Sequence, residues 1–143
     1  MQIKLTEETT EVTVDNYLKN GGGTKQEWPW KLLYDNQGAG DKWASYSMNG
    51  WIVFKFKKPI LIRGFGLKSA NDCPDRDPKH IKFMVHDVFD ERPKKDQNYI
   101  EVFKANDQKF TKRWQTKVYR LERTWMVHSV KLYILENHGD NMT

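Results

Sequence analysis

A polar loop at residues 69–78 carries the most suggestive chemistry of the chain. Its prolines and Asx residues favour tight, rigid turns. Its single arginine, Arg76, stands among three aspartates, and a guanidinium can form a two-pronged hydrogen-bonded pair with one carboxylate. We expect such a pair to fix the shape of the loop. In the alternative interpretation, Arg76 or Asn71 points outward and hydrogen-bonds the hydroxyl groups of a bound sugar.

Aromatic side chains beside the expected loops offer surfaces on which a sugar ring can stack. Trp28, Trp30, Tyr46 and Trp125 each stand next to a turn-forming stretch rather than inside a strand-like run. Ligand sites combine aromatic walls with a few polar groups. These four rings, with the two polar side chains of the loop, are the predicted ligand-binding residues. Trp43, in contrast, has the bulk and the position to cap the core.

Asp35 and Asn36 form a second polar turn. Their side chains can hydrogen-bond the nearby backbone, and the Asp35 carboxylate can also ligate a hard cation such as calcium. Asp35 is therefore the predicted metal ligand. A structural calcium ion is the only cofactor that the sequence suggests.

Catalytic motifs are missing from the sequence. The glycine-rich stretch before Thr24 and Lys25 has the hydroxyl and the lysine in the wrong order for a phosphate-binding loop. The four histidines lack the spacing of zinc sites, and no serine-nucleophile signature is present. Cys73 has acidic neighbours, which do not activate a thiol. We therefore expect a protein without enzymatic activity.

Length and composition predict a single domain over residues 1–143. The chain is long enough to bury a core, and its six Trp, six Tyr and seven Phe supply large rings for it. The lone cysteine cannot form an internal disulfide, which favours a reducing compartment. No apolar stretch reaches the length of a membrane span, and residues 1–20 lack a signal-peptide pattern. A complete chain of this kind is expected in the cytoplasm or elsewhere inside the cell.

The charge of the chain bears on its partners. A formal net charge of +5 permits attraction to phosphates but is modest for a nucleic-acid-binding protein. We expect no nucleic-acid partner. Attachment to anionic membranes through a basic sheet face is the least favoured function.

Alternation of apolar and polar residues predicts β-strands through most of the chain. In residues 51–57, Ile52, Phe54 and Phe56 share one face and the lysines point the other way. Similar strand-like runs occur at residues 60–68, 81–87, 99–103 and 127–135. Turn-rich breaks separate most of these runs, and an amphipathic helix is not evident. The pattern predicts an all-β, antiparallel β-sandwich.

Three blocks of sequence, in the right order, resemble the galactose-binding-like β-sandwiches. This family includes the coagulation-factor type C (discoidin) domains and related carbohydrate-binding modules. In the first block, residues 32–36 and 41–45 resemble a "leu-x-asp-gly" and "lys/arg-trp-x-ser" segment, and residues 51–56 look like the strand that follows it. The second block, residues 64–78, contains a subgroup's "ser-ala-asn-asp" loop. The third block, residues 130–139, is similar to a late family strand.

The resemblance implies a jelly-roll sandwich that binds carbohydrate through loops at one end and often holds a calcium ion, here at Asp35. The chain reads Asn36 where the family usually has glycine. It also ends at Thr143, where the family continues into a last strand that bears a glutamate ligand. We therefore expect a domain that lacks this strand or that was excised from a longer chain.

Two classes of function follow. The first is a glycan-recognition module, which the resemblance and the loop-side aromatic rings favour. The second is an intracellular protein-interaction or adaptor domain, which the unpaired Cys73 and the missing signal-peptide pattern favour. Aromatic rings gathered around an open concavity would support sugar binding, whereas a flat apolar patch elsewhere would support protein binding.

Overall fold

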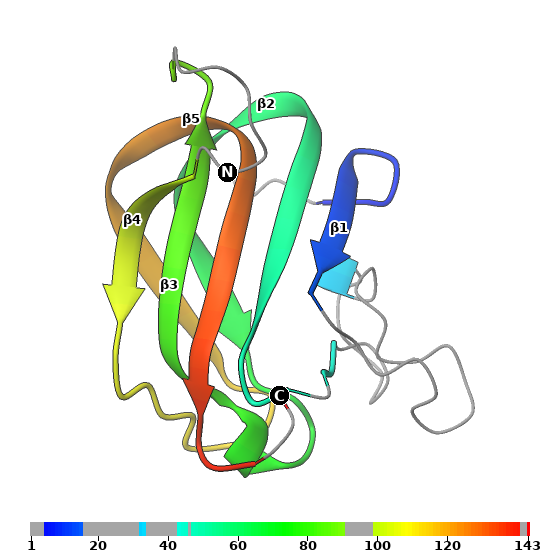
Figure 1. Cartoon of the computed structure of the whole chain (residues 1–143), viewed down its shortest axis with the longest axis vertical. Helices are drawn as coiled ribbons and strands as arrows, with labels where there is room; N and C mark the ends of the chain where they lie inside the picture. The colour runs from blue at the N-terminus through cyan, green and yellow to red at the C-terminus, as the bar shows by residue number, and fades with distance from the viewer. Residues whose placement is uncertain (1–4, 16–31, 34–42, 46, 91–98, 141–142) are drawn as a thin grey trace.

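Five antiparallel strands form the described part of the protein. The computed structural model describes residues 5–15, 32–33, 43–45, 47–90, 99–140 and 143. Its elements are β1 (Thr10–Val14), β2 (Gly50–Lys68), the short 3-10 helix η3 (Pro74–Arg76), β3 (Pro78–Asp87), β4 (Ile100–Ala105) and β5 (Thr116–Asn137). The strands pair in the order β1-β2-β5-β3-β4 (Figure 1). Within these residues, no helix has the length and apolar character needed to cross a membrane.

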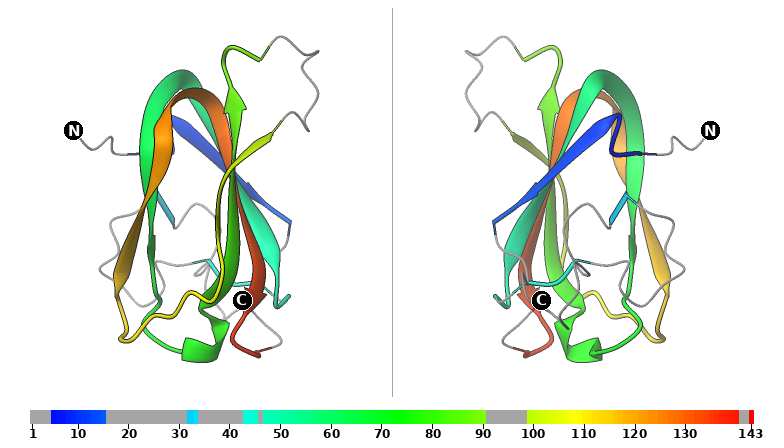
Figure 2. Two further views of the ribbon diagram at one scale, coloured as in Figure 1. Left: turned by 90° about the vertical axis from the view of Figure 1, so that its left-hand side faces the viewer. Right: turned by 90° about the vertical axis from the view of Figure 1, so that its right-hand side faces the viewer.

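The two long strands bend together and so turn one sheet into two layers. The pairing of β2 with β5 shifts register between Lys55 and Ile60 and again between Ile62 and Gly64. Bulges of this kind bend a strand and increase its twist. Figure 2 shows the result: β2 and β5 cross over at one end of the molecule and continue in the second layer. The fold is thus the antiparallel β-sandwich that the alternating pattern predicts.

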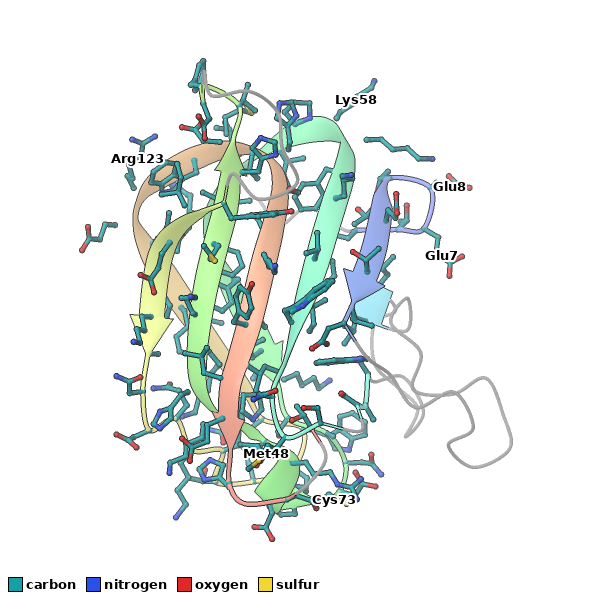
Figure 3. The ribbon with its side chains drawn as sticks, viewed as in Figure 1. Glu7, Glu8, Met48, Lys58, Cys73 and Arg123 are labelled. Atoms are coloured by element: carbon teal, nitrogen blue, oxygen red, sulfur yellow. The ribbon has the colours of Figure 1, made fainter. Side chains whose placement is uncertain are left out.

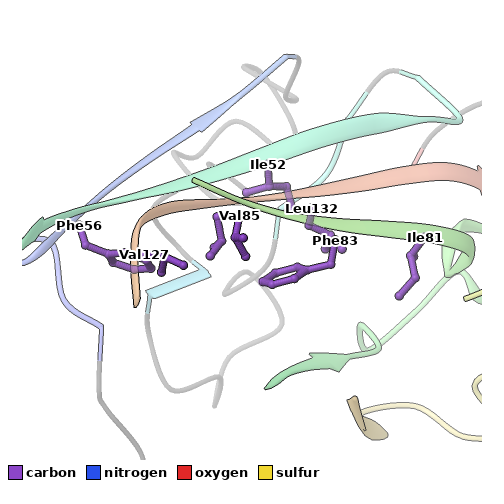
Figure 4. Close-up of a cluster of buried hydrophobic side chains, with 8 residues drawn as sticks. Ile52, Phe56, Ile81, Phe83, Val85, Val127 and Leu132 are labelled. Atoms are coloured by element: carbon purple, nitrogen blue, oxygen red, sulfur yellow. The ribbon is translucent and has the colours of Figure 1, made fainter. Parts of the chain in front are cut away.

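The core lies between the layers. Its cluster of buried side chains comprises Ile52, Phe56, Ile81, Phe83, Val85, Val127, Val130 and Leu132 (Figure 4). Phe65, which follows the bend of β2, stacks on Phe83 of β3 with ring centroids 4.2 Å apart. This stack joins the two layers. Trp43 packs against the same cluster, as predicted.

The predicted strands are present, but three of them are parts of longer ones. Residues 51–57 and 60–68 belong to the single strand β2, although the pair Lys58 and Pro59 suggests a break. The run at residues 127–135 is the second half of β5, which begins at Thr116. The first half of β5 and the short strand β1 were not predicted from the sequence.

Gly64 allows β2 and β5 to approach closely after the bend. A Cβ atom added at Gly64 would lie 2.3 Å from the backbone oxygen of Tyr119 on β5. No real Cβ contact is that short, and backbone cannot swing away as a side chain can. At Gly66, two residues further along the same strand, an added Cβ would meet its nearest atom at 3.6 Å, which is ordinary contact.

We predict that Gly64→Ala destabilises the fold and that Gly66→Ala does not. The alanine at position 64 must push β5 away from β2, and overpacking of this kind costs about 1–3 kcal/mol. Urea denaturation of both variants measures the two free energies of unfolding. Equal stability of the two variants would contradict the close approach at Gly64.

Candidate functional site

Three connecting segments gather at the end of the sandwich opposite the bend. They are the loop from Ser69 to Asp77, which contains η3, the connection from β4 to β5, and the residues that follow β5. The Ser69 N–H donates to the Gln115 carbonyl at 2.8 Å, and the His138 N–H donates to the Asp75 carbonyl at 3.0 Å. These bonds join all three segments. Cys73 marks this end in Figure 3.

Arg113 locks the 69–77 loop. Its Nη1 donates to the carbonyl of Asp72 at 3.1 Å and to Asp77 Oδ1 at 3.0 Å, while its Nη2 donates to Asp77 Oδ2. The Asp77 side chain is only 5% exposed. The hydrogen bond to Asp77 raises the pKa of Arg113 above its ordinary value. This two-pronged pair therefore holds a buried carboxylate and sets the shape of the loop.

Arg76 pairs with a different segment. Its Nε donates to Asp140 Oδ2 at 3.1 Å, and the two side chains are 33% and 28% exposed. Burial by itself lowers the pKa of Arg76, but the hydrogen bond to Asp140 and the nearby negative charges outweigh it and raise that pKa. The prediction that Arg76 pairs with an aspartate of its own loop is wrong. Arg113, from the connection before β5, binds Asp77 instead.

Trp114 is the aromatic residue at this end that sequence reasoning missed. Its backbone has a φ of 59°, in the left-handed region that a bulky residue rarely adopts. The Lys68 ammonium lies 5.2 Å from the centroid of its ring. Strained backbone conformations cluster at functional sites. The positive φ of Trp114, which follows directly after Arg113, could not be read from residue type alone.

A cavity of about 140 Å³ opens between these loops and the lower part of the core. Apolar and polar groups meet in its wall. Its lining includes Trp43, Leu67, Phe110 and Trp114 on the apolar side and Ser69, Asp72, Arg76 and Asp77 on the polar side. Pockets for drug-sized ligands have about 300–1,000 Å³. This cavity therefore suits one small polar unit rather than an extended ligand.

Trp125 does not belong to this site. It lies within β5, opposite Ile62, and packs against the core. The Arg123 guanidinium covers its ring at 3.8 Å from the centroid, and Figure 3 shows Arg123 at the other end of the molecule from Cys73. The expectation that Trp125 stands beside a loop with the other ligand-binding residues is wrong, because the first half of β5 was not recognised as strand.

The other predicted site residues divide into two groups. Asn71 is half-buried between Ala70 and Asp72, which both line the cavity. Trp28, Trp30, Tyr46 and Asp35 lie outside the described residues.

The calcium site at Asp35 therefore stays a prediction. Across the described ranges, no group of three or more His, Cys, Asp or Glu side chains is placed to hold a metal ion.

Solved structures share this architecture. A module named CpGH89CBM32-5 from Clostridium perfringens, in complex with GalNAc-β-1,3-galactose, matches with a TM-score of 0.71 and 12% identity over 94% of this chain and 88% of that chain. An F5/8 type C domain from Bacteroides fragilis matches with a TM-score of 0.71 and 12% identity over 97% and 88%. The family 32 carbohydrate-binding module of Clostridium perfringens NanJ, in complex with galactose, matches with a TM-score of 0.64 and 6% identity over 94% and 87%.

At these identities the likeness establishes the fold alone, which is the galactose-binding-like β-sandwich that the sequence blocks predict. No curated protein sequence matches the chain. A family model described as "Sad1 / UNC-like C-terminal" matches residues 25–143, which is most of the chain. The chain therefore belongs to the Sad1/UNC-like C-terminal family.

Proposed function

We propose that this domain is a non-catalytic glycan-recognition module that binds a sugar unit at the loop end of the sandwich. The observation that carries the proposal is the cavity, because its lining includes both an aromatic residue, Trp114, and a charged residue, Arg76. A sugar presents both an apolar ring face and hydroxyl groups. An aromatic ring can stack on the first, and charged or polar side chains can hydrogen-bond the second.

Ion pairs hold the residues of the site in position before a ligand binds. The 69–77 loop is held by the buried pair of Arg113 and Asp77, and the Arg76 guanidinium is held by Asp140. A site that is ordered before binding loses less conformational entropy when the ligand arrives. The paired Arg76 keeps further N–H groups, because a guanidinium has five and the Asp140 contact uses one.

Proteins of the same fold support a glycan as the ligand class. Two of the similar structures are complexes, one with GalNAc-β-1,3-galactose and one with galactose. The adaptor alternative receives less support. In the part of the chain that the structure describes, the exposed large apolar side chains come from different segments, namely Met48, Leu61, Phe89, Val118 and Leu135.

We predict that Trp114→Ala weakens glycan binding by about tenfold, the loss expected when an aromatic contact of about 1–1.5 kcal/mol is removed. A glycan array that includes galactose and GalNAc-β-1,3-galactose identifies a ligand, and titration calorimetry then compares the variants. Phe89→Ala is the matched control, because Phe89 is an aromatic residue that is 75% exposed and lies after β3. An array without signal above background, or equal affinities of the Trp114 variant and the native protein, would argue against the proposal.

We also predict that Arg113→Gln lowers the free energy of unfolding by about 2–3 kcal/mol, because it leaves the buried Asp77 carboxylate without its charged partner. Arg76→Gln should cost less than about 1 kcal/mol, since its ion pair with Asp140 is partly exposed to solvent. Chemical denaturation measures both values. A larger loss of stability for Arg76→Gln than for Arg113→Gln would show that Arg76, and not Arg113, fixes the loop.

A further inference from the structure

A row of side chains crosses the outer face of the sheet, on the opposite face from Ile52 and Leu132, which line the loop-end cavity. Trp51 of β2 is directly opposite Tyr133 of β5, and Tyr133 is directly opposite Lys82 of β3. Lys131 stands in the next row of β5 on the same face. Neighbours of these residues along the strands, such as Ile52, Phe83 and Leu132, are buried in the core. Because side chains alternate along a strand, the row points away from the core.

Aromatic rings surround the Lys131 ammonium. Its Nζ lies 4.7 Å from the ring centroid of Trp51, 4.6 Å from that of Tyr133 and 5.7 Å from that of Tyr99. The Tyr99 hydroxyl is in turn hydrogen-bonded to the Ser129 hydroxyl at 2.9 Å, which fixes the third ring. The Lys82 ammonium lies 4.9 Å from the Tyr133 centroid. Two ammonium groups thus lie against a single ring.

The rings place these charges but do not neutralise them. Cation–π contact orders an ammonium group, yet the group keeps its full charge and its N–H donors. Among the ion pairs of the described residues, none involves Lys82 or Lys131. The nearest acidic residues in the pairing scheme are Asp15, whose Oδ1 accepts a hydrogen bond from the Trp51 N–H, and the exposed Glu101, opposite Met84.

We infer that this outer face is a second binding site, and that its ligand is an acidic polysaccharide. Sulfate or carboxylate groups of such a chain supply negative charge opposite the two ammonium groups that lie against the Tyr133 ring, and they accept charge-assisted hydrogen bonds from Lys82 and Lys131. The site goes beyond the proposed loop-end function and does not depend on it.

Other polyanions fit this face less well. Nucleic-acid bases bind such sheets by stacking on open aromatic faces, whereas here ammonium groups lie over the rings of Trp51 and Tyr133. An anionic membrane would favour protruding apolar side chains. The most exposed of these, Phe89 and Val118, lie after β3 and in the first half of β5, outside this row.

The test measures binding of a short heparin oligosaccharide by titration calorimetry at physiological salt. We expect saturable binding that Lys131→Gln weakens by about tenfold, since one charge-assisted hydrogen bond is lost. Lys57→Gln removes the same charge from an exposed position at the bend, and we expect it to change the affinity by about twofold at most. Tyr133→Leu keeps both lysines but removes two cation–π contacts, and we expect a loss of about fivefold.

Further arms identify the ligand chemistry and separate the two sites. Hyaluronan, which carries carboxylates only, shows whether carboxylates suffice or sulfates are needed, and neutral dextran should not bind. Trp114→Ala should leave heparin binding unchanged, so that failure of the loop-end proposal is distinguishable from failure of this one. The inference is overturned if heparin does not bind, if the Lys131 and Lys57 variants behave alike, or if oligothymidylate binds more tightly than heparin through the same residues.

Discussion

The pairing of β2 with β5 is the constraint on which the rest of the structure depends. The ladder of hydrogen-bonded partners runs from Gly50 opposite Ile134, through the bend, to Lys68 opposite Thr116. The same two strands therefore build both layers and hold them at a fixed separation. Because β2 and β5 each bend back on themselves, the first and the last pairs of this ladder lie close to the same end of the molecule. This is why the loops that form the cavity gather there (Figure 1).

Positively charged side chains have two kinds of partner in this protein, carboxylates and aromatic rings. At the loop end, arginines are paired with carboxylates, and the bidentate bond of Arg113 to Asp77 holds backbone in place. On the outer face of the sheet, the Lys131 ammonium is held by rings and keeps its charge available. The first arrangement stabilises a loop, and the second leaves an ammonium group that makes no ion pair among the described residues. Both depend on the register of β5, which supplies Lys131 and lies directly after the segment that supplies Arg113.

The fold could be read from the sequence wherever apolar residues alternate strictly, as at Ile52, Phe54 and Phe56. Prediction failed where polar residues interrupt a strand. Lys58 and Pro59 occupy the bend of β2, and the polar stretch before Trp125 concealed the first half of β5. A local pattern does not show that a strand bends and continues, because bending depends on bulges in the partner pairing.

The site was predicted less completely, because its contacts are distant in sequence. Composition pointed to an arginine that locks the 69–78 loop through a carboxylate. It chose Arg76 rather than Arg113, which is 36 residues from Asp77. The rings of Trp51 and Tyr133 beside Lys131 were missed for the same reason, since only strand register brings them together. Trp114 was missed because its position depends on a positive φ, which residue type does not show.

Many contacts of the fold join residues that are far apart in the sequence, and this determines when folding can occur. Arg76 and Asp140 are 64 residues apart, and the layers close only when β5 joins both β2 and β3. Closing such long loops costs entropy before any contact compensates for it, which makes folding slow. A chain emerging from the ribosome holds β2 and β3 without their shared partner until β5 has been synthesised. During that interval their apolar faces are open to chaperones.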